Sequence, residues 1–153
     1  MKTVKINSYA KVNIGLKLLH KRIDGYYDIS TVFQEIDLYD EMTISRSSNS
    51  ALDFSCNVDW LKNDKHNLCV IAYNRIKDLY DIGGVDINLV KNISRGSGLG
   101  SGSSNAAAVM KGLRKIFNLK ITDVELEKIS AEIGADVPFF IRGATQILSL
   151  IHI

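Results

Sequence analysis

A glycine-rich segment between a strand pattern and an alanine-rich run places the strongest constraint on the fold. It reads Ser94-Arg-Gly-Ser-Gly-Leu-Gly-Ser-Gly-Ser-Ser-Asn105 and lies between the alternating residues 85–90 and the alanines that begin at Ala106. The alternation predicts a strand, and the alanine-rich run predicts a helix that continues to Phe117. The order strand, glycine loop, helix is typical of an anion site, because glycine leaves backbone amides open and a helix N-terminus carries partial positive charge.

The spacing of this segment separates it from two better-known phosphate loops. It lacks the Gly-Lys-Ser/Thr ending of a Walker A loop, and its glycines never complete GxGxxG. A flexible Gly/Ser turn is the alternative interpretation, but four alternating glycines directly before a Ser-Ser helix start favour phosphate binding. On this hypothesis the hydroxyls of Ser103 and Ser104 contact phosphate or Mg²⁺.

The front third of the chain has the alternating pattern of β-strands. Apolar residues alternate with Lys and Asn over residues 3–19, and strand-like runs follow at 29–38, 41–46 and 51–55. We therefore expect an antiparallel β region here, with the further short strand at 85–90.

Helical patterns appear in two places outside the glycine segment. Over residues 67–80 apolar residues recur at helical spacing, and Gly83 with Gly84 is the expected stop. Thr122 and Glu125 form a capping box before a second helix, which Gly134 is expected to end in a left-handed conformation. Mixed strands with these helices predict an α+β domain.

Composition and charge argue against several classes of function. The 153-residue chain is 46% hydrophobic and 24% charged with a net charge of +2, which predicts one globular domain without a nucleic-acid surface. No stretch has the roughly 20 apolar residues of a membrane span, and the N-terminus has no signal-peptide pattern. Cys56 and Cys69 lack CxxC spacing, so we expect neither zinc nor a disulfide framework but two core residues in a reducing cytoplasm.

Several motifs together make the chain resemble the GHMP kinases. The glycine segment is similar to their phosphate loop, whose pattern is close to G-x-G-L-G-S/G-G-S-S-x-A. The other motifs resemble, in order and spacing, the branch that phosphorylates a cytidine-diphosphate-linked methylerythritol. The motifs are Gly96–Ala107, Ala10–Asn13, Asp24–Tyr26, Val32–Gln34 and Gly134–Phe140. The resemblance implies a GHMP kinase N-terminal domain, with a ribosomal protein S5 domain 2-like fold in which a mixed sheet packs against helices.

A kinase that acts on an alcohol needs a proton acceptor and groups that stabilise the transferring phosphoryl group. The resemblance implies that Asp136 is this base and that Lys11 is its partner. Asn13 follows Lys11 by two residues and so shares its strand face. Without the resemblance, Asp136 between Gly134 and Pro138 also fits a turn or cap aspartate, and Lys11 a solvated strand lysine.

The resemblance also implies ATP and Mg²⁺ as cofactors. The residues implied in nucleotide binding are Ser94, Arg95, Gly96, Ser97, Gly98, Leu99, Gly100, Ser101, Gly102, Ser103 and Ser104 of the loop, Asn67 and Leu68 at the adenine, and Lys91. Asn67 equally fits a plain helix N-cap.

Substrate contacts are implied for Asn13, Tyr26 and Tyr27. Tyr26 lies where the family stacks an aromatic ring on cytosine. Tyr27 departs from the family, which usually has His there, and a phenol is longer than imidazole and hardly ionises near neutral pH.

The expected function is ATP-dependent phosphorylation of the 2-hydroxyl of this cytidine diphosphate derivative, in the cytoplasm, on the non-mevalonate route to isoprenoid precursors. The alternatives are another GHMP kinase, of homoserine or mevalonate type, and a non-catalytic ligand- or RNA-binding domain of the same fold. We expect a small-molecule substrate and no nucleic-acid or membrane partner, and the oligomeric state stays open.

A separate expectation concerns the last residues of the chain. Family members are nearly twice as long, so residues 1–147 are expected to be the N-terminal ATP-binding domain, with the C-terminal GHMP domain missing. The apolar end at 148–153 differs from the Gly-, Ala- and Glu-rich continuation of the family, and we expect it to be non-native and the chain alone to be nearly inactive. The alternative is that residues 146–151 form a final strand of the sheet.

Overall fold

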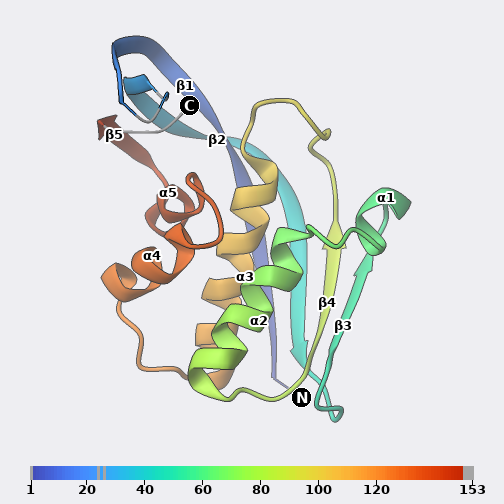
Figure 1. Cartoon of the computed structure of the whole chain (residues 1–153). Coiled ribbons are helices and arrows are strands. Elements are labelled where there is room, and N and C mark those ends of the chain that lie inside the picture. Colours follow the sequence, from blue (N-terminus) through green and yellow to red (C-terminus); the bar gives the residue numbers. More distant parts are fainter. Residues whose placement is uncertain (1, 24, 26, 150–153) are drawn as a thin grey trace.

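The fold is that of a computed structural model, which describes residues 2–23, 25 and 27–149. A five-stranded sheet is covered on one face by helices (Figure 1), which confirms the predicted α+β class. The strands are β1 (Thr3–Lys21), β2 (Tyr27–Arg46), β3 (Leu52–Cys56), β4 (Val85–Val90) and β5 (Thr145–Ser149). The helices are α1 (Asp59–Lys62), α2 (Leu68–Tyr80), α3 (Ser101–Phe117), α4 (Asp123–Ala131) and α5 (Val137–Arg142).

The sheet is built around the long strand β2. Its order is β1-β2-β4-β3, and β5 pairs with β2 at residues 30–34, whereas β4 pairs with residues 41–46. These two pairings are antiparallel, and so is that of β1 with β2, which the sequence predicts for the front third. The prediction is wrong for β3, which lies parallel to β4, because α1 and α2 cross between the two strands and return the chain in the same direction.

A bulge interrupts the pairing of β1 with β2. Tyr9 lies opposite Tyr39 but Ala10 lies opposite Ile36, so β2 contains two extra residues at this point. The two strand-like runs that the sequence predicts in this region are therefore one continuous strand. A bulge of this kind bends the strand and re-aims the side chains beside it.

The two ends of α2 are fixed by polar side chains. Asn67 is the N-cap, and its side-chain oxygen accepts a hydrogen bond from the amide of Cys69 at 2.9 Å. The helix ends at Asp81, which adopts a left-handed conformation with φ of 45°. The expected stop at Gly83 and Gly84 is wrong, because a short aspartate also tolerates this conformation and ends the helix two residues earlier.

The predicted capping box of α4 is present. The Thr122 hydroxyl accepts a hydrogen bond from the Glu125 amide, and the Glu125 carboxylate accepts one from the Thr122 amide. The helix ends in a tight turn in which the amide of Glu132 donates to Ile129 at 3.2 Å, with Glu132 right-handed. The expectation that Gly134 closes this helix in a left-handed conformation is therefore wrong.

The central helix α3 lies directly against the sheet. It begins at Ser101, inside the glycine segment and earlier than the alanine run predicts, because the Ser104 amide already donates to Gly100 at 2.9 Å. Its alanines at 106–108 are at most 1% exposed. A Cβ at Gly112 would lie 2.4 Å from Cδ1 of Ile44, so the missing side chain lets α3 approach β2 closely.

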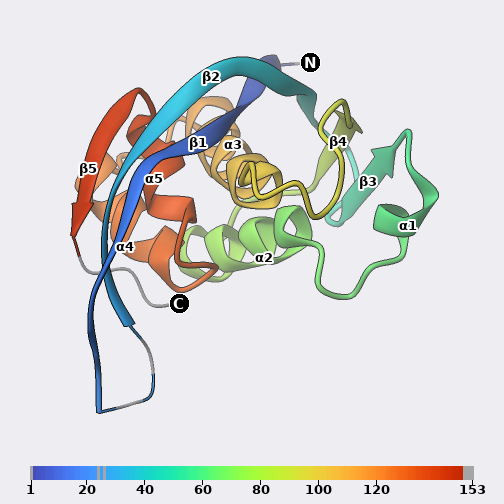
Figure 2. The ribbon, with the colours of Figure 1, turned by 90° about the horizontal axis from the view of Figure 1, so that it is seen from above.

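The far end of the β1–β2 hairpin extends beyond the helical layer (Figure 2). Its side chains Ile14, Leu16 and Leu18 are more than half exposed. Strand β5 pairs along this part of β2. Residues 145–149 are therefore a strand of the sheet, in agreement with the alternative for the chain end. Residues 150–153 lie outside the described residues, and a non-native end at 148–153 stays a prediction.

Among the helices of the described residues, none combines the length and the apolar character needed to cross a membrane.

Candidate functional site

A cavity opens between the N-terminal end of α2 and the glycine loop. Its volume is about 320 Å³, within the ~300–1,000 Å³ that is usual for small-molecule sites. Residues 94–103 form one wall, Asn67 and Leu68 belong to the opposite wall, and Lys91 lines the cavity just after β4. The structure thus brings together all the residues predicted to bind nucleotide except Ser104.

Several residues of the cavity were not indicated by the sequence. Most come from α1 and the segment after it, and they are Trp60, Leu61, Asp64, His66, Cys69 and Asn105. The Arg95 guanidinium lies 5.0 Å from the centroid of the Trp60 ring, so the two walls meet at this edge. Burial raises the pKa of the Cys69 thiol to about 12, so this side chain stays protonated at neutral pH.

The glycine loop depends on left-handed backbone conformations. Gly96, Gly98 and Gly100 have φ angles of 73°, 75° and 71°, which side chains of L-residues disfavour. Gly100 is constrained further, because a Cβ there would lie 2.8 Å from Cζ of Phe140 and 3.2 Å from Cε of Lys11. Gly100 therefore packs the loop against both α5 and β1.

A buried carboxylate that the sequence analysis did not single out lies behind the loop. Asp40 of β2 is 0% exposed. Its Oδ1 accepts hydrogen bonds from the main-chain amides of Asn92 at 2.7 Å and Ile93 at 2.9 Å. Its Oδ2 accepts hydrogen bonds from Oγ of Ser101 at 2.7 Å and from Nδ2 of Asn105 at 3.0 Å. Asp40 thus contacts the chain on both sides of the loop.

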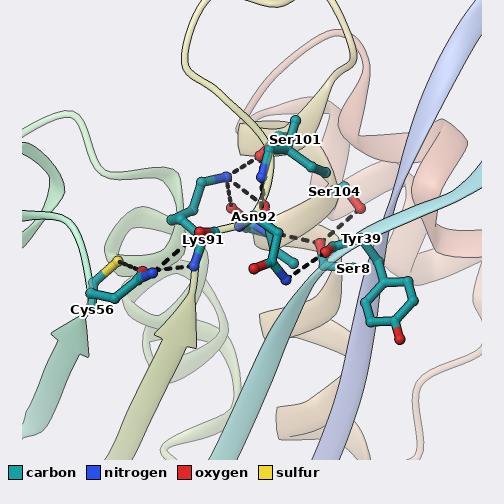
Figure 3. Close-up of polar contacts among 11 residues, drawn as sticks. Ser8, Tyr39, Cys56, Lys91, Asn92, Ser101 and Ser104 are labelled. Atoms are coloured by element: carbon teal, nitrogen blue, oxygen red, sulfur yellow. Dashed lines mark hydrogen bonds and ion pairs between the residues drawn. The ribbon is translucent and has the colours of Figure 1, made fainter.

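Lys91 neutralises this carboxylate (Figure 3). Its Nζ lies 2.5 Å from Oδ2 of Asp40, donates to Oδ1 of Asn105 at 3.1 Å and also contacts Oγ of Ser101. Burial works to raise the pKa of Asp40, but the hydrogen bonds from Lys91, Ser101, Ile93 and Asn105 outweigh it and hold that pKa below 3.8. The ammonium group expected at the nucleotide is therefore engaged in an ion pair inside the protein.

The serines at the start of α3 face different surroundings. Ser101 donates to Asp40, whereas Oγ of Ser104 accepts a hydrogen bond from Oγ of Ser8 on β1 at 2.8 Å (Figure 3). Ser8 and Ser104 are both buried, and neither lines the cavity. Ser103 does line it and is half-buried. Of the three serines in the first turn of α3, Ser103 is thus the one whose hydroxyl remains for a ligand, while Ser104 is used to hold α3 on the sheet.

Lys11 lies on the other side of Gly100. It is only 6% exposed, which does not fit a solvated strand lysine. Its Nζ donates to Oδ1 of Asn13 at 2.6 Å, so the two side chains share the face that strand alternation predicts, and it lies 4.4 Å from the centroid of the Phe33 ring. Among the described carboxylates none forms an ion pair with this ammonium.

Asp136 is the residue immediately before α5. It is half-buried and occupies the N-cap position of α5 at the end of a turn, but its side chain accepts no capping hydrogen bond. Phe140 follows four residues later and therefore lies on the same side of the helix. Because the ring of Phe140 and the side chain of Lys11 both border Gly100, α5 brings this side of the helix toward the end of the glycine loop.

The predicted substrate residues do not all lie together. Asn13 is beside Lys11, but Tyr27 lies at the far end of the hairpin, opposite Lys21, with its ring 5.9 Å from Nζ of that lysine. Tyr27 is 39% exposed. Tyr26 lies outside the described residues.

The described side chains contain no group of three or more His, Cys, Asp and Glu residues placed to hold a metal ion. The loop side of the cavity presents the glycine-rich backbone, the hydroxyls of Ser94, Ser97 and Ser103, and the Arg95 guanidinium.

The comparison with known proteins places this fold and site in a class. The GHMP kinases N terminal domain family matches residues 67–144, half of the chain, including the whole glycine loop. The chain therefore belongs to this family, as its motifs predict.

Two relatives of this chain carry the same enzyme name. The chain is 42% identical over 145 residues to 4-diphosphocytidyl-2-C-methyl-D-erythritol kinase of Clostridium beijerinckii, and 40% identical over 147 residues to that of Caldanaerobacter subterraneus subsp. tengcongensis. The alignments cover 94% and 95% of this chain but 51% and 50% of the relatives. The chain thus spans about half the length of the curated relatives it matches.

Solved structures agree with this placement. A crystal structure of 4-(cytidine 5'-diphospho)-2C-methyl-D-erythritol kinase matches with a TM-score of 0.83 at 32% identity, over 95% of this chain and 52% of that one. The mevalonate kinase of Methanococcus jannaschii matches with a TM-score of 0.71 at 18% identity, over 97% of this chain and 54% of that one. The second likeness shows a shared fold.

Proposed function

We propose that residues 1–147 form the ATP-binding half of a kinase that phosphorylates the 2-hydroxyl of 4-diphosphocytidyl-2-C-methyl-D-erythritol. The observation that carries the proposal is the cavity, where left-handed glycines and the N-terminal end of α3 face the start of α2. The 42% identity to a kinase of this name supports the choice of substrate. The whole protein would act in the cytoplasm, in the synthesis of isoprenoid precursors.

The nucleotide would occupy the cavity with its phosphates at the loop. Residues 94–103 carry no acidic side chain, and their backbone amides, the Ser103 hydroxyl and the nearby Arg95 suit a polyanion. Adenine would lie against Asn67 and Leu68 on the opposite wall. Mg²⁺, bound with the triphosphate, supplies neutralisation of its negative charge.

The acceptor alcohol would react at the end of the loop beside Gly100. Asp136 takes the proton as the O–H bond breaks, the new O–P bond forms, and the bond from the γ-phosphorus to the bridging oxygen breaks to release ADP. Lys11 is a buried lysine next to Gly100, so it is placed to stabilise negative charge on the reacting oxygens as the partner of Asp136 in the reaction. Asn13 holds the ammonium of Lys11 in place.

The acceptor side of the site is proposed to extend from Asn13 toward the hairpin. Tyr26 and Tyr27 would contact the cytosine, with the Tyr27 hydroxyl in the role that histidine has in the family. The exposure of Tyr27 leaves its ring open to such a ligand.

Two measurements test the proposal. Calorimetry with ATP on this chain tests the nucleotide site, and we expect saturable binding that competes with ADP and with inorganic tripolyphosphate. Competition between 4-diphosphocytidyl-2-C-methyl-D-erythritol, mevalonate and homoserine as acceptors for the whole protein tests the substrate. Equal turnover of the three acceptors would remove the substrate assignment, and absence of ATP binding would remove the nucleotide site.

A further inference from the structure

The two ends of the glycine loop converge on one side chain. Residues 92 and 93, which lead into the loop, donate their amides to Oδ1 of Asp40. Ser101 and Asn105, in the first turns of the helix that leaves the loop, donate to Oδ2. A single buried carboxylate therefore joins the entry and the exit of residues 94–100.

Between these ends, the backbone around Gly96 and Gly98 is loosely packed, whereas Leu99 and Gly100 lie against β1 and α5. A Cβ built on Gly96 or on Gly98 would have no neighbour within 4 Å, so this part of the loop is not packed against side chains. Glycine also has more backbone freedom to lose than any other residue. Fixing both ends reduces the number of conformations in which the amides diverge from a bound anion.

We propose that Asp40 is a positioning residue of the nucleotide site, whose carboxylate sets the separation of the loop ends and thereby keeps the loop amides convergent. This inference rests on the proposed binding of ATP. Asp40 does not line the cavity, so it acts through the loop and not by contact with the ligand.

A second layer of hydrogen bonds supports this role. Nδ2 of Asn105 donates both to Asp40 at 3.0 Å and to Oγ of Ser8 at 2.9 Å, while its Oδ1 accepts from Lys91. Ser8 lies directly opposite Asp40 in the β1–β2 pairing, next to the bulge. The strand pairing thus places both side chains at the same point of α3.

Removing the Asp40 carboxylate has two effects that must be distinguished: it breaks the ion pair with Lys91, and it releases the ends of the loop. Removing one partner of a buried pair leaves an uncompensated charge and destabilises the whole fold, whereas removing both charges is much less costly. Asp40→Asn alone would therefore confuse lost stability with a displaced loop. The double variant Asp40→Asn with Lys91→Met removes both charges and serves as the corrected comparison.

The experiment compares the wild-type chain with Asp40→Asn, Lys91→Met and the double variant. Hydrogen exchange of amides 94–100 without nucleotide reports the loop, exchange in β4 reports the surrounding fold, and thermal unfolding reports stability. Calorimetry gives the dissociation constants of ATP and of inorganic tripolyphosphate. Ser8→Ala is a matched control that removes a buried hydroxyl of the second layer without touching Asp40.

In the double variant we expect an unfolding midpoint close to that of the wild type, faster exchange confined to the loop, and at least about tenfold weaker binding of both ligands. Ser8→Ala should change affinity much less than the double variant. Wild-type exchange and affinity in the double variant would overturn the inference, as would tighter binding by Asp40→Asn alone, which would mean that Asp40 only restrains Lys91. If the wild-type chain binds neither ligand, the proposed function fails, and loop exchange still decides whether Asp40 holds the loop.

Discussion

The main-chain amide of Lys11 donates a hydrogen bond to the carbonyl oxygen of Leu99, with 2.9 Å between the two atoms. Strand β1 is therefore tied to the glycine loop one residue before Gly100, where the Lys11 side chain also lies. Because both the backbone and the side chain of Lys11 contact the loop, the ammonium cannot move independently of the phosphate site. The fold fixes a cation at the place where phosphoryl transfer is proposed.

Asp136→Asn in the whole protein tests the proposed base. An amide cannot accept the hydroxyl proton, so turnover should fall by about 10²- to 10⁴-fold. The dissociation constant of ATP should stay unchanged, because the cavity lining does not include Asp136. Asp78→Asn, which changes an exposed carboxylate on α2, is the control. Turnover near that of the control would exclude Asp136 from the mechanism.

Lys11→Met tests the buried cation while keeping most of the side-chain stem. Turnover should fall by roughly 10²-fold or more, because one group that stabilises the reacting oxygens is lost. The unfolding temperature should hold or rise, since an apolar side chain replaces a buried charge without an acidic partner. Lys17→Met on the exposed part of the same strand is the matched control. A loss of turnover that only follows a loss of folded protein would speak against this role.

Gly100→Ala and Gly96→Ala form a pair that separates backbone strain from packing. Both glycines have φ near 70°, but only at Gly100 would a Cβ collide with Phe140 and Lys11. Such a collision costs about 1–3 kcal/mol, so Gly100→Ala should bind ATP roughly 5- to 150-fold more weakly than Gly96→Ala. Calorimetry on folded variants measures this difference. Equal affinities would mean that the end of the loop does not contact the phosphates.

The loss of stability at low pH should depend on Asp40. Its pKa is held below 3.8 in the folded chain, so the stabilisation is complete above the unfolded value and is lost as the pH falls through the lower folded value. Below about pH 4 the unfolding temperature of the wild type should therefore fall more steeply than that of the variant with Asp40→Asn and Lys91→Met. Thermal unfolding from pH 6 to pH 3 measures both slopes, with Asp78→Asn expected to follow the wild type.

Tyr27→His tests the departure at the proposed cytosine contact. If Tyr27 only fills the position of the usual histidine, the variant should retain its preference for the cytidine diphosphate acceptor, with KM within a few-fold of the wild type. Tyr80→His, which changes a comparably exposed tyrosine on α2, is the control. A switch of preference toward mevalonate or homoserine in the competition assay would contradict the proposal.

Local patterns predicted the parts of this fold that depend on neighbours in sequence. The strand at 85–90, the helix that ends at Tyr80 and the capping box at Thr122 each depend on residues a few positions apart, and the structure has all three. The parallel pairing of β3 was missed, because alternation does not reveal which strand lies beside it. The stop at Asp81 was missed because glycine is only the commonest residue with positive φ.

The candidate site likewise has a part that local sequence predicts and a part that depends on distant contacts. Residues 94–103 form one continuous segment, so the sequence alone indicated an anion loop, whereas Asp40 is linked to that loop by contacts 51 to 65 residues away along the chain. Its signal was an acid within a strand pattern, and such an acid usually faces solvent. It shares its strand face with the buried Met42 and Ile44, but its contacts with residues 91–105 leave no mark in the local sequence.

The position of α3 also determines where the cavity can adapt. Its buried alanines and the contact of Gly112 with Ile44 hold the phosphate side against the sheet, so this wall is stiff. The other wall includes the four-residue helix α1, whose Trp60 is 42% exposed and lies against Arg95 of the loop. With the proposed nucleotide in this cavity, its phosphates would meet the stiff wall and its base the more exposed one, so we expect the domain to tolerate exchange of the purine more readily than loss of a phosphate.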